Sequence, residues 1–187
     1  MQDISSFDTF FKQAENLIGK INCLVNNAGI SLHERNITEV TELTFDNQFN
    51  TNLKGPYFLS KEFICYYLDN NISNGKILFT TSERGEFVDD IPYGLTKAAI
   101  NSLVKGLASR LIKYDIRVDA IGPGITVSHL TGLSKDNLYN STQMNQRNYL
   151  PMEMAESACF FLSDISNCMT GQILVCNEGK SINSYWK

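Results

Sequence analysis

The segment Ile21-Asn22-Cys23-Leu24-Val25-Asn26-Asn27-Ala28-Gly29 decides the fold, because a short apolar run in it gives way to a polar turn. Such a run is typical of a buried strand, and Asn and Gly are expected where a chain leaves a strand. Residues 76–80, 116–121 and 172–176 form similar apolar runs. The sequence therefore predicts a strand over residues 21–25 and over each of these three runs.

Helical patterns lie before and between these strands. Apolar residues recur at helical spacing over residues 7–18. Thr41 is a possible cap for the next helix, and a long helix is predicted from Pro92, a residue favoured in the first turn. A further helix is predicted over residues 152–162. The predicted inward faces carry Phe45, Phe49, Asn52 and Leu53 in the helix after Thr41, and Ala98, Ala99, Ser102, Leu103, Gly106 and Leu111 in the helix after Pro92.

Apolar strands that alternate with helices predict an α/β fold with a doubly wound parallel sheet. In such sheets, ligands bind outside the carboxyl ends of the strands. Asn26, Ser82 and Pro123 each lie just after a predicted strand. We therefore expect the functional site at this edge of the sheet.

The composition is that of an ordinary soluble globular protein. The chain has 187 residues, of which 43% are hydrophobic and 19% are charged, and its formal net charge is −4. This acidic balance, with no block of Lys or Arg, argues against nucleic acid as a partner. The sequence has neither an apolar run of the ~20 residues that span a bilayer nor a secretory signal at its start, so we expect no membrane partner.

The five cysteines are odd in number and scattered, and they form no Cys-x-x-Cys pair. Most lie in apolar stretches, where a free Cys behaves as a small hydrophobic residue. His33 and His129 lie far apart and have no second ligand at a useful spacing, so no metal site is predicted. Free thiols fit a reducing compartment, and we expect a cytoplasmic location.

Tyr93 and Lys97 carry the strongest chemical signal, because residues four apart share a helix face. An ammonium beside a phenol favours the phenolate, so we expect Lys97 to lower the pKa of Tyr93. Such a phenol is suited to proton transfer in carbonyl and alcohol chemistry. Alone, however, the spacing Tyr-x-x-x-Lys arises by chance in many helices.

Three other polar positions have both a structural and a functional interpretation. Residues 26–29 are expected in any turn after a strand. Asn52 lies on an apolar helix face, where an unpaired amide would cost a few kcal/mol, so it needs a defined partner. That partner is backbone in the structural interpretation. Ser82 is a turn serine or a catalytic one, and Thr81 is the alternative for the catalytic position.

Taken in order along the chain, these polar and glycine positions resemble the pattern of the short-chain dehydrogenase/reductase family. They are Asn26-Asn27-Ala28-Gly29, Asn52, Ser82, the Tyr93/Lys97 pair and Pro123-Gly124. The resemblance runs over essentially the whole chain and implies a single Rossmann-like domain over residues 1–187. It implies these catalytic roles: Tyr93 is the general acid/base, Lys97 lowers its pKa and binds ribose, Ser82 orients the carbonyl, and Asn52 holds a relay water. Besides Tyr93 and Lys97, the cofactor-binding residues that it implies are Asp3, Ile4, Asn27, Ala28, Gly29, Pro123, Gly124, Thr126 and Ser128.

The chain matches a further family stretch, Arg-x-x-x-Pro-x-Glu-x-Ala, at residues 147–155, and departs from the family pattern at three places. Ser128 stands where Thr is usual. Asp119 replaces the common Asn. The segment Asn177-Glu178-Gly179 replaces the usual Asp-Gly-Gly.

The largest departure is at the start of the chain. Family members open with a Gly-rich turn that seats the cofactor pyrophosphate on a helix N-terminus, and no Gly-x-x-x-Gly-x-Gly occurs here. Asp3-Ile4 matches the Asp-Val at the end of the family's third strand. We therefore expect the C-terminal portion of the domain, without its first two to three strands. The strand over residues 21–25 would then lie bare at a sheet edge.

The resemblance implies an enzyme that interconverts a carbonyl and an alcohol by hydride transfer with NAD or NADP. Its partners would be a small-molecule substrate and further copies of the chain, in a dimer or tetramer. The alternative is an inactive remnant of such an enzyme that acts, if at all, through protein contacts.

Overall fold

The computed structural model describes residues 3–182. Its helices are α1 (Phe7–Ile18), α2 (Glu42–Phe49), α3 (Gly55–Asp69), α4 (Pro92–Leu111) and α5 (Pro151–Leu162), and its strands are β1 (Cys23–Asn26), β2 (Gly75–Thr80), β3 (Ile116–Pro123) and β4 (Ile173–Cys176). Short 3-10 turns are η1 (Ile37–Glu39), η3 (Glu83–Glu86), η4 (Ile112–Tyr114) and η5 (Asp164–Ser166), and η2 (Asn50–Lys54) is a π-helical turn.

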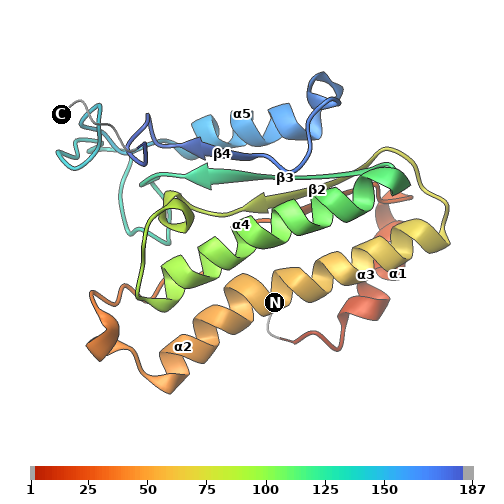
Figure 1. The fold of residues 1–187 in the computed structure, drawn as a ribbon, viewed down its shortest axis with the longest axis horizontal. Helices are drawn as coiled ribbons and strands as arrows, with labels where there is room; N and C mark the ends of the chain where they lie inside the picture. The colour runs from red at the N-terminus through yellow and green to blue at the C-terminus, as the bar shows by residue number, and fades with distance from the viewer. Residues whose placement is uncertain (1–2, 183–187) are drawn as a thin grey trace.

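The strands within the described residues form one parallel sheet in the order β1-β2-β3-β4. Leu24 of β1 lies opposite Ile77 of β2, and Ile77 lies opposite Val118 of β3. Helices α1, α3 and α4 cover one face of the sheet, and α5 covers the other (Figure 1). The predicted doubly wound, Rossmann-like α/β fold is confirmed, as are all four predicted strands within two residues at each end.

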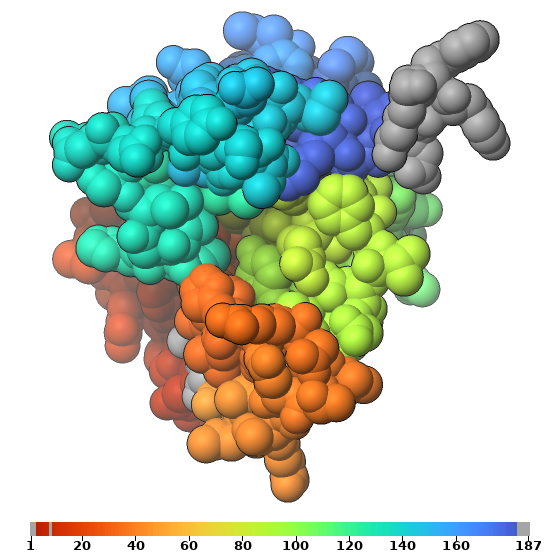
Figure 2. Space-filling model, turned by 90° about the vertical axis from the view of Figure 1, so that its left-hand side faces the viewer, coloured from red at the N-terminus to blue at the C-terminus, as the bar shows by residue number. Residues whose placement is uncertain are grey.

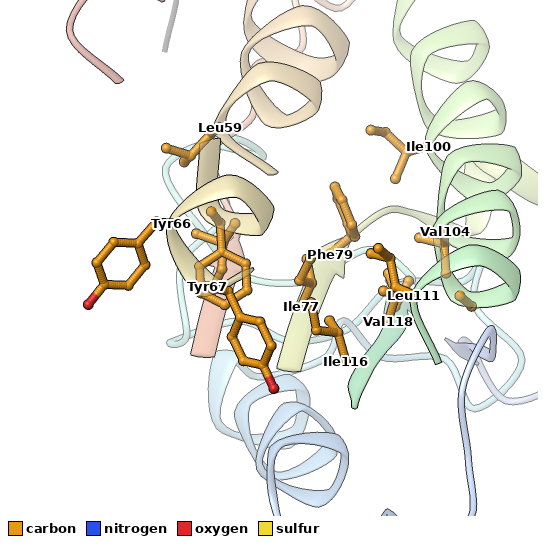
Figure 3. Packing of buried hydrophobic residues seen from close by; sticks show 14 of the residues in the cluster. Leu59, Tyr66, Tyr67, Ile77, Phe79, Ile100, Val104, Leu111, Ile116 and Val118 are labelled. Carbon is orange, nitrogen blue, oxygen red and sulfur yellow. The ribbon is translucent and has the colours of Figure 1, made fainter. Parts of the chain in front are cut away.

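The main core lies between the sheet and helices α1, α3 and α4 (Figure 3). Phe63 and Tyr67 of α3 pack there with Phe79 of β2 and Val104 of α4, and all four are at most 1% exposed. A smaller cluster on the other face joins Leu78 and Ile121 to α5. The side chains of each strand alternate between these two cores.

The predicted inward face of α4 is wrong in part. Only Leu111 of the predicted set is buried, Ala99 and Leu103 are half-buried, and Ala98, Ser102 and Gly106 are exposed. The buried stripe instead runs through Lys97, Ile100, Asn101, Val104, Ala108 and Leu111. The larger apolar side chains fill the space over β2 and β3, and the small residues face outward.

Helices α2 and α3 are joined without a break by the π-helical turn η2. Thr41 caps α2 as predicted, and its side chain accepts a hydrogen bond from the Thr44 N–H. The turn changes the helix register, so the predicted apolar face is not continuous: Phe45 is 39% exposed, whereas Asn52 is buried. A π-turn inserted in a helix is frequent at functional sites.

Strand β1 lies at one end of the sheet and pairs only with β2 among the described residues. Its Val25 side chain is 44% exposed on the face opposite α3. Asp3 and Ile4, which were matched to the end of a strand, are not in one. The Asp3 carboxylate instead accepts hydrogen bonds from the N–H and the hydroxyl of Ser5, just before α1.

Candidate active site

A cavity of about 1230 Å³ opens at the carboxyl ends of the strands. Figure 2 looks onto this end, where the segments that follow β1 (orange), β2 (lime) and β3 (blue-green) meet around a hollow. The predicted site residues that line the cavity are Asn27, Gly29, Ser82, Tyr93, Lys97, Pro123, Gly124, Thr126 and Ser128. Asp3, Ile4, Ala28 and Asn52 are not among its lining residues.

Tyr93 and Ser82 come together from two adjacent elements. Pro92 starts α4 and places Tyr93 in its first turn, while Ser82 follows β2 and caps η3 by accepting from the Arg84 N–H at 3.2 Å. Burial raises the pKa of Tyr93, and side-chain hydrogen bonding with Ser82 and the charge of Arg84 oppose that rise. The nearby carboxylate of Glu83 raises this pKa further.

Lys97 lies one turn further along α4 and is only 5% exposed. Its Nζ donates to the Thr80 carbonyl at 3.0 Å and lies 5.5 Å from the centre of the Tyr93 ring. Burial lowers the pKa of Lys97 to about 8. The pKa of Tyr93 is raised overall in this structure, because the burial of the phenol outweighs the interactions that favour the phenolate.

Asn52 has the backbone partner that its burial requires. Its Oδ1 accepts from the Ile30 N–H and its Nδ2 donates to the Ile30 carbonyl, both at 2.8 Å. Nδ2 also lies 3.3 Å from the Thr96 hydroxyl on α4. A Cβ atom at Gly29 would lie 3.5 Å from both Asn52 Oδ1 and Lys97 Nζ, so Asn52 stands directly behind the cavity wall.

The hydroxyl groups of the two threonines before Ser82 form hydrogen bonds with other parts of the fold. The Thr81 hydroxyl lies 2.7 Å from Asn101 Oδ1 and 3.2 Å from the Lys97 carbonyl, and it is buried against α4. The Thr80 hydroxyl donates to Asn27 Oδ1 at 2.8 Å and so fixes the turn after β1. Ser82 is therefore the hydroxyl of this stretch that faces Tyr93.

The segment after β3 forms the opposite wall of the cavity. Thr126 donates to the Gly124 carbonyl at 3.0 Å, and the Ser128 hydroxyl lies 3.4 Å from the Thr126 carbonyl. A Cβ at Gly124 would lie 2.7 Å from the Tyr149 ring and 3.2 Å from Asn177 Cβ. Glycine is needed here because the backbone passes so close to these neighbours.

Two residues of the sequence pattern support the site from outside it. The Asp119 carboxylate accepts from the Gln172 N–H at 2.9 Å and lies 3.8 Å from Arg117, so this unusual residue ties β3 to the start of β4. Burial raises the pKa of Asp119. Glu153 at the start of α5 pairs with Arg147 at 2.5 Å and accepts from the Leu150 N–H, which lowers its pKa to about 2.

Sequence reasoning missed several polar cavity residues, among them Glu83, Arg84 and Lys180. Arg84 forms an ion pair with Asp89 at 2.5 Å, and Lys180 forms one with Glu83 at 3.2 Å. The position of Glu83 beside Ser82 was a signal in the sequence. Lys180 had no such signal, because it reaches Glu83 across 97 residues.

The described residues suit part of a nicotinamide dinucleotide. Side chains able to bond a ribose or an amide, namely Asn27, Lys97 and Thr126, line the cavity on three sides. A pyrophosphate would need a glycine-rich turn at a helix N-terminus, and no lining residue within residues 3–182 belongs to such a turn. The described residues hold no group of three His, Cys, Asp or Glu side chains placed to bind a metal ion.

The comparisons with known proteins agree with this geometry. The sequence model for enoyl-(acyl carrier protein) reductases matches residues 1–181. The chain is 32% identical to an L-rhamnose 1-dehydrogenase (NADP(+)) from Thermoplasma acidophilum, with 93% of this chain and 70% of the relative covered. It is 30% identical to a 7alpha-hydroxysteroid dehydrogenase from Paraclostridium sordellii, with 97% and 72% covered.

Solved structures show the same likeness. A 3-ketoacyl-(acyl-carrier-protein) reductase from Brucella melitensis complexed with NADH superposes with a TM-score of 0.86 at 27% identity, over 97% of this chain and 76% of that one. ElxO with NADP bound gives a TM-score of 0.84 at 27% identity, over 96% and 75%. Between residues 3 and 182, no helix has the length and apolarity to cross a bilayer. By its sequence and its fold, the chain belongs to the short-chain dehydrogenase/reductase family.

Proposed function

We propose that this protein is an oxidoreductase that interconverts a small-molecule carbonyl and its alcohol, with Tyr93 as general acid/base. One observation carries the proposal: Tyr93, Ser82 and Lys97 converge on one cavity at the carboxyl ends of the strands. The alternative hydroxyl, Thr81, is committed to α4. The relatives named above are dehydrogenases and reductases, which supports the same reaction class.

Tyr93 acts as the proton donor in the direction of carbonyl reduction. Its raised pKa keeps the phenol protonated near neutral pH, which is the form that can give a proton to the substrate oxygen. Ser82 donates a second hydrogen bond to that oxygen and holds it in reach of Tyr93. Both groups then stabilise the negative charge that develops on the oxygen as the carbonyl is reduced.

Lys97 and Asn52 support this pair. The bond to the Thr80 carbonyl fixes the Lys97 ammonium under the Tyr93 ring, where we propose that it binds the ribose hydroxyls. Asn52 holds the Ile30 backbone behind Gly29 and is proposed to anchor a water that links Lys97 to solvent. Its position next to Lys97 supports this role.

The proposed cofactor is NAD or NADP, which supplies or accepts the hydride when bound. Two of the solved structures hold NADH and NADP, and one relative is named as NADP(+)-dependent. The proposed contacts are Asn27, Ala28 and Gly29 after β1, Pro123, Gly124, Thr126 and Ser128 after β3, and Asp3 and Ile4 for the adenine end. Gly124 and Thr126 line the cavity directly, whereas Asp3 and Ile4 lie outside its lining.

We further propose that residues 1–187 form one domain, that it works in the cytoplasm, and that it assembles as a dimer or tetramer. The five free cysteines support a reducing compartment. The exposed edge of β1 and its Val25 side chain favour the rival proposal, an inactive remnant that acts through protein contacts. Light scattering and activity measurements on the same sample separate these possibilities.

The test is carbonyl reduction by a version of the chain that carries the glycine-rich strand, turn and helix of a relative at its N-terminus. Tyr93→Phe should abolish the activity and leave the fold intact, and Ser82→Ala should lower turnover by about 10²–10⁴-fold. Tyr114→Phe, in η4 just before the start of β3, is the matched control and should retain activity. A silent Ser82→Ala beside a damaging Thr81→Ala would assign the role to Thr81 instead.

A further inference from the structure

Glu83 is a buried carboxylate next to the proposed catalytic serine. It is only 4% exposed, it is the first residue of η3, and it lines the cavity. An isolated carboxylate is costly to bury, so its charge needs partners. The mechanism proposed above gives Glu83 no role.

The partners of Glu83 come from the segment that follows β4. Asn177 Nδ2 donates to Glu83 Oε2 at 3.0 Å, and Lys180 Nζ pairs with Glu83 Oε1 at 3.2 Å. Asn177 is 1% exposed, and its Nδ2 also lies 3.1 Å from the Ser181 hydroxyl. A Cβ added at Gly124 would lie 3.2 Å from Asn177 Cβ, so this segment touches two walls of the cavity.

We propose that Glu83 is a positioning residue for the reaction: held by Asn177 and Lys180, it fixes the turn that carries Ser82 and sets a negative charge beside Tyr93. This inference rests on the proposed function, because it assigns a task within that site. Asn177 and Lys180 lie 94 and 97 positions after Glu83 in the sequence. The segment that follows β4 therefore helps to build the turn that carries Ser82.

The charge of Glu83 explains why Asn, and not Asp, stands at position 177. An Asn side chain can donate to a carboxylate, whereas an ionised Asp can only accept. The Asp of the usual Asp-Gly-Gly pattern would set two carboxylates against each other at this place. One of them would then take up a proton at higher pH than normal. The departure at Asn177 is thus explained by the carboxylate that faces it.

The charge of Glu83 acts on Tyr93 within a mixed set of neighbours. Glu83 raises the pKa of Tyr93 and Arg84 lowers it. Arg84 is paired with Asp89, and Glu83 with Lys180. Lys97 lies under the Tyr93 ring. Glu83 also acts on Tyr149, whose pKa is raised by burial and then by Glu178 and Glu83, while Arg147 opposes the rise.

The first test measures the unfolding equilibrium of the 187-residue chain. Asn177→Asp should raise the unfolding constant about 10- to 100-fold, the loss expected for a hydrogen bond to a charged group. The loss should shrink as the pH is lowered, because the facing carboxylates come to share a proton. Adding Glu83→Gln to Asn177→Asp should restore stability, since the Gln amide donates to the new carboxylate. A double variant no better than the sum of its single changes would overturn the proposal.

The second test follows the ionisation of Tyr93 by NMR of ¹³C-labelled tyrosine, with Tyr93→Phe to assign the signal. Glu83→Gln should lower the pKa of Tyr93, and Lys180→Gln, which strips Glu83 of its counter-ion, should raise it. Glu178→Gln removes the same charge from the exposed part of the same loop and should leave Tyr93 unchanged. If Glu83→Gln does not fold, the pKa of Tyr93 in Lys180→Gln still tests the proposed role of Glu83. Equal pKa values in Lys180→Gln, Glu178→Gln and the unaltered chain would refute the role. Neither test needs cofactor or substrate, so both remain decisive if the proposed reaction is wrong.

Discussion

The two faces of the sheet differ in how they are covered. On one face, α1, α3 and α4 bury a continuous apolar core in which Phe63 and Val104 are fully enclosed. On the other face α5 packs near β3, while Val25 of β1 is 44% exposed and lines the cavity together with Leu78 and Ile121. The covered face therefore supplies most of the stability of the fold, and the open face supplies the surface on which a cofactor can lie.

Among the changes compared below, the largest effect is expected at Lys97, which belongs to α4 and lines the cavity. Lys97→Ala should lower kcat/KM by about 10²–10⁴-fold in the N-terminally extended version, because the buried ammonium beneath Tyr93 is lost. Lys105→Ala, on the exposed side of the same helix, is the matched control. Steady-state rates with reduced cofactor measure both. Equal rates for the two variants would show that Lys97 has no role in the reaction.

A pair of substitutions, one in the core and one at an exposed position, tests the two faces directly. Phe63→Ala, on the covered face, should cost about 3–5 kcal/mol of unfolding free energy, because it leaves a cavity in a closed core. Val25→Ala, on the open face, should cost less than about 1 kcal/mol, since its side chain already meets solvent. Urea unfolding of both variants gives the comparison. Similar losses at the two positions would show that the open face is covered in solution.

Two glycines allow a closely packed position at the cavity wall to be compared with an open position on α4. Gly124→Ala should cost about 1–3 kcal/mol, because the new methyl group meets the Tyr149 ring at 2.7 Å. Gly106→Ala meets nothing within 4 Å on the exposed side of α4. It should stabilise the chain by about 0.5–1 kcal/mol through helix propensity. Thermal unfolding shows whether each substitution stabilises or destabilises the chain. A stabilising Gly124→Ala would contradict the close contact between Gly124 and the Tyr149 ring.

The smallest expected effect is a pH dependence at the start of α5. Arg147 and the Leu150 N–H lower the pKa of Glu153 to about 2 from 4.5. A lowered carboxyl pKa contributes stability above 4.5, and that stability is lost as the pH falls from there towards about 2. Glu153→Gln should therefore cost about 0.5–1 kcal/mol at neutral pH, a small value because the pair is partly exposed. Melting curves of the variant and the unaltered chain should converge near pH 2, and curves that stay equally far apart there would exclude the ion pair as the cause.

The strands and the site edge could be predicted from the sequence because both depend on local pattern. Apolar runs ending in polar turns located β1, β2, β3 and β4, and the carboxyl-end rule placed Ser82 and Pro123 at one edge of the sheet, where both line the cavity. The buried face of α4 could not be predicted in the same way. Its small residues suit either solvent or a close neighbour, and only the shape of the sheet decides between them.

The pKa of Tyr93 and the partners of Glu83 could not be predicted from the sequence for a related reason. The spacing of Tyr93 and Lys97 reveals their proximity but not how deeply each is buried, and burial dominates both pKa values. The ion pair of Glu83 with Lys180 joins positions 97 apart. Contacts of that kind depend on the completed fold rather than on neighbouring residues.

The most direct test of the open-face account is a fluorescence titration of the 187-residue chain with NADH and NADPH. The proposed contacts to ribose and nicotinamide, Asn27, Lys97 and Thr126, line the cavity, but its described lining has no glycine-rich helix N-terminus for the pyrophosphate. We expect no saturable binding to this chain and saturable binding to the N-terminally extended version. Saturable micromolar binding by a soluble, monomeric 187-residue chain would contradict it, because the open face would then hold a phosphate site of its own.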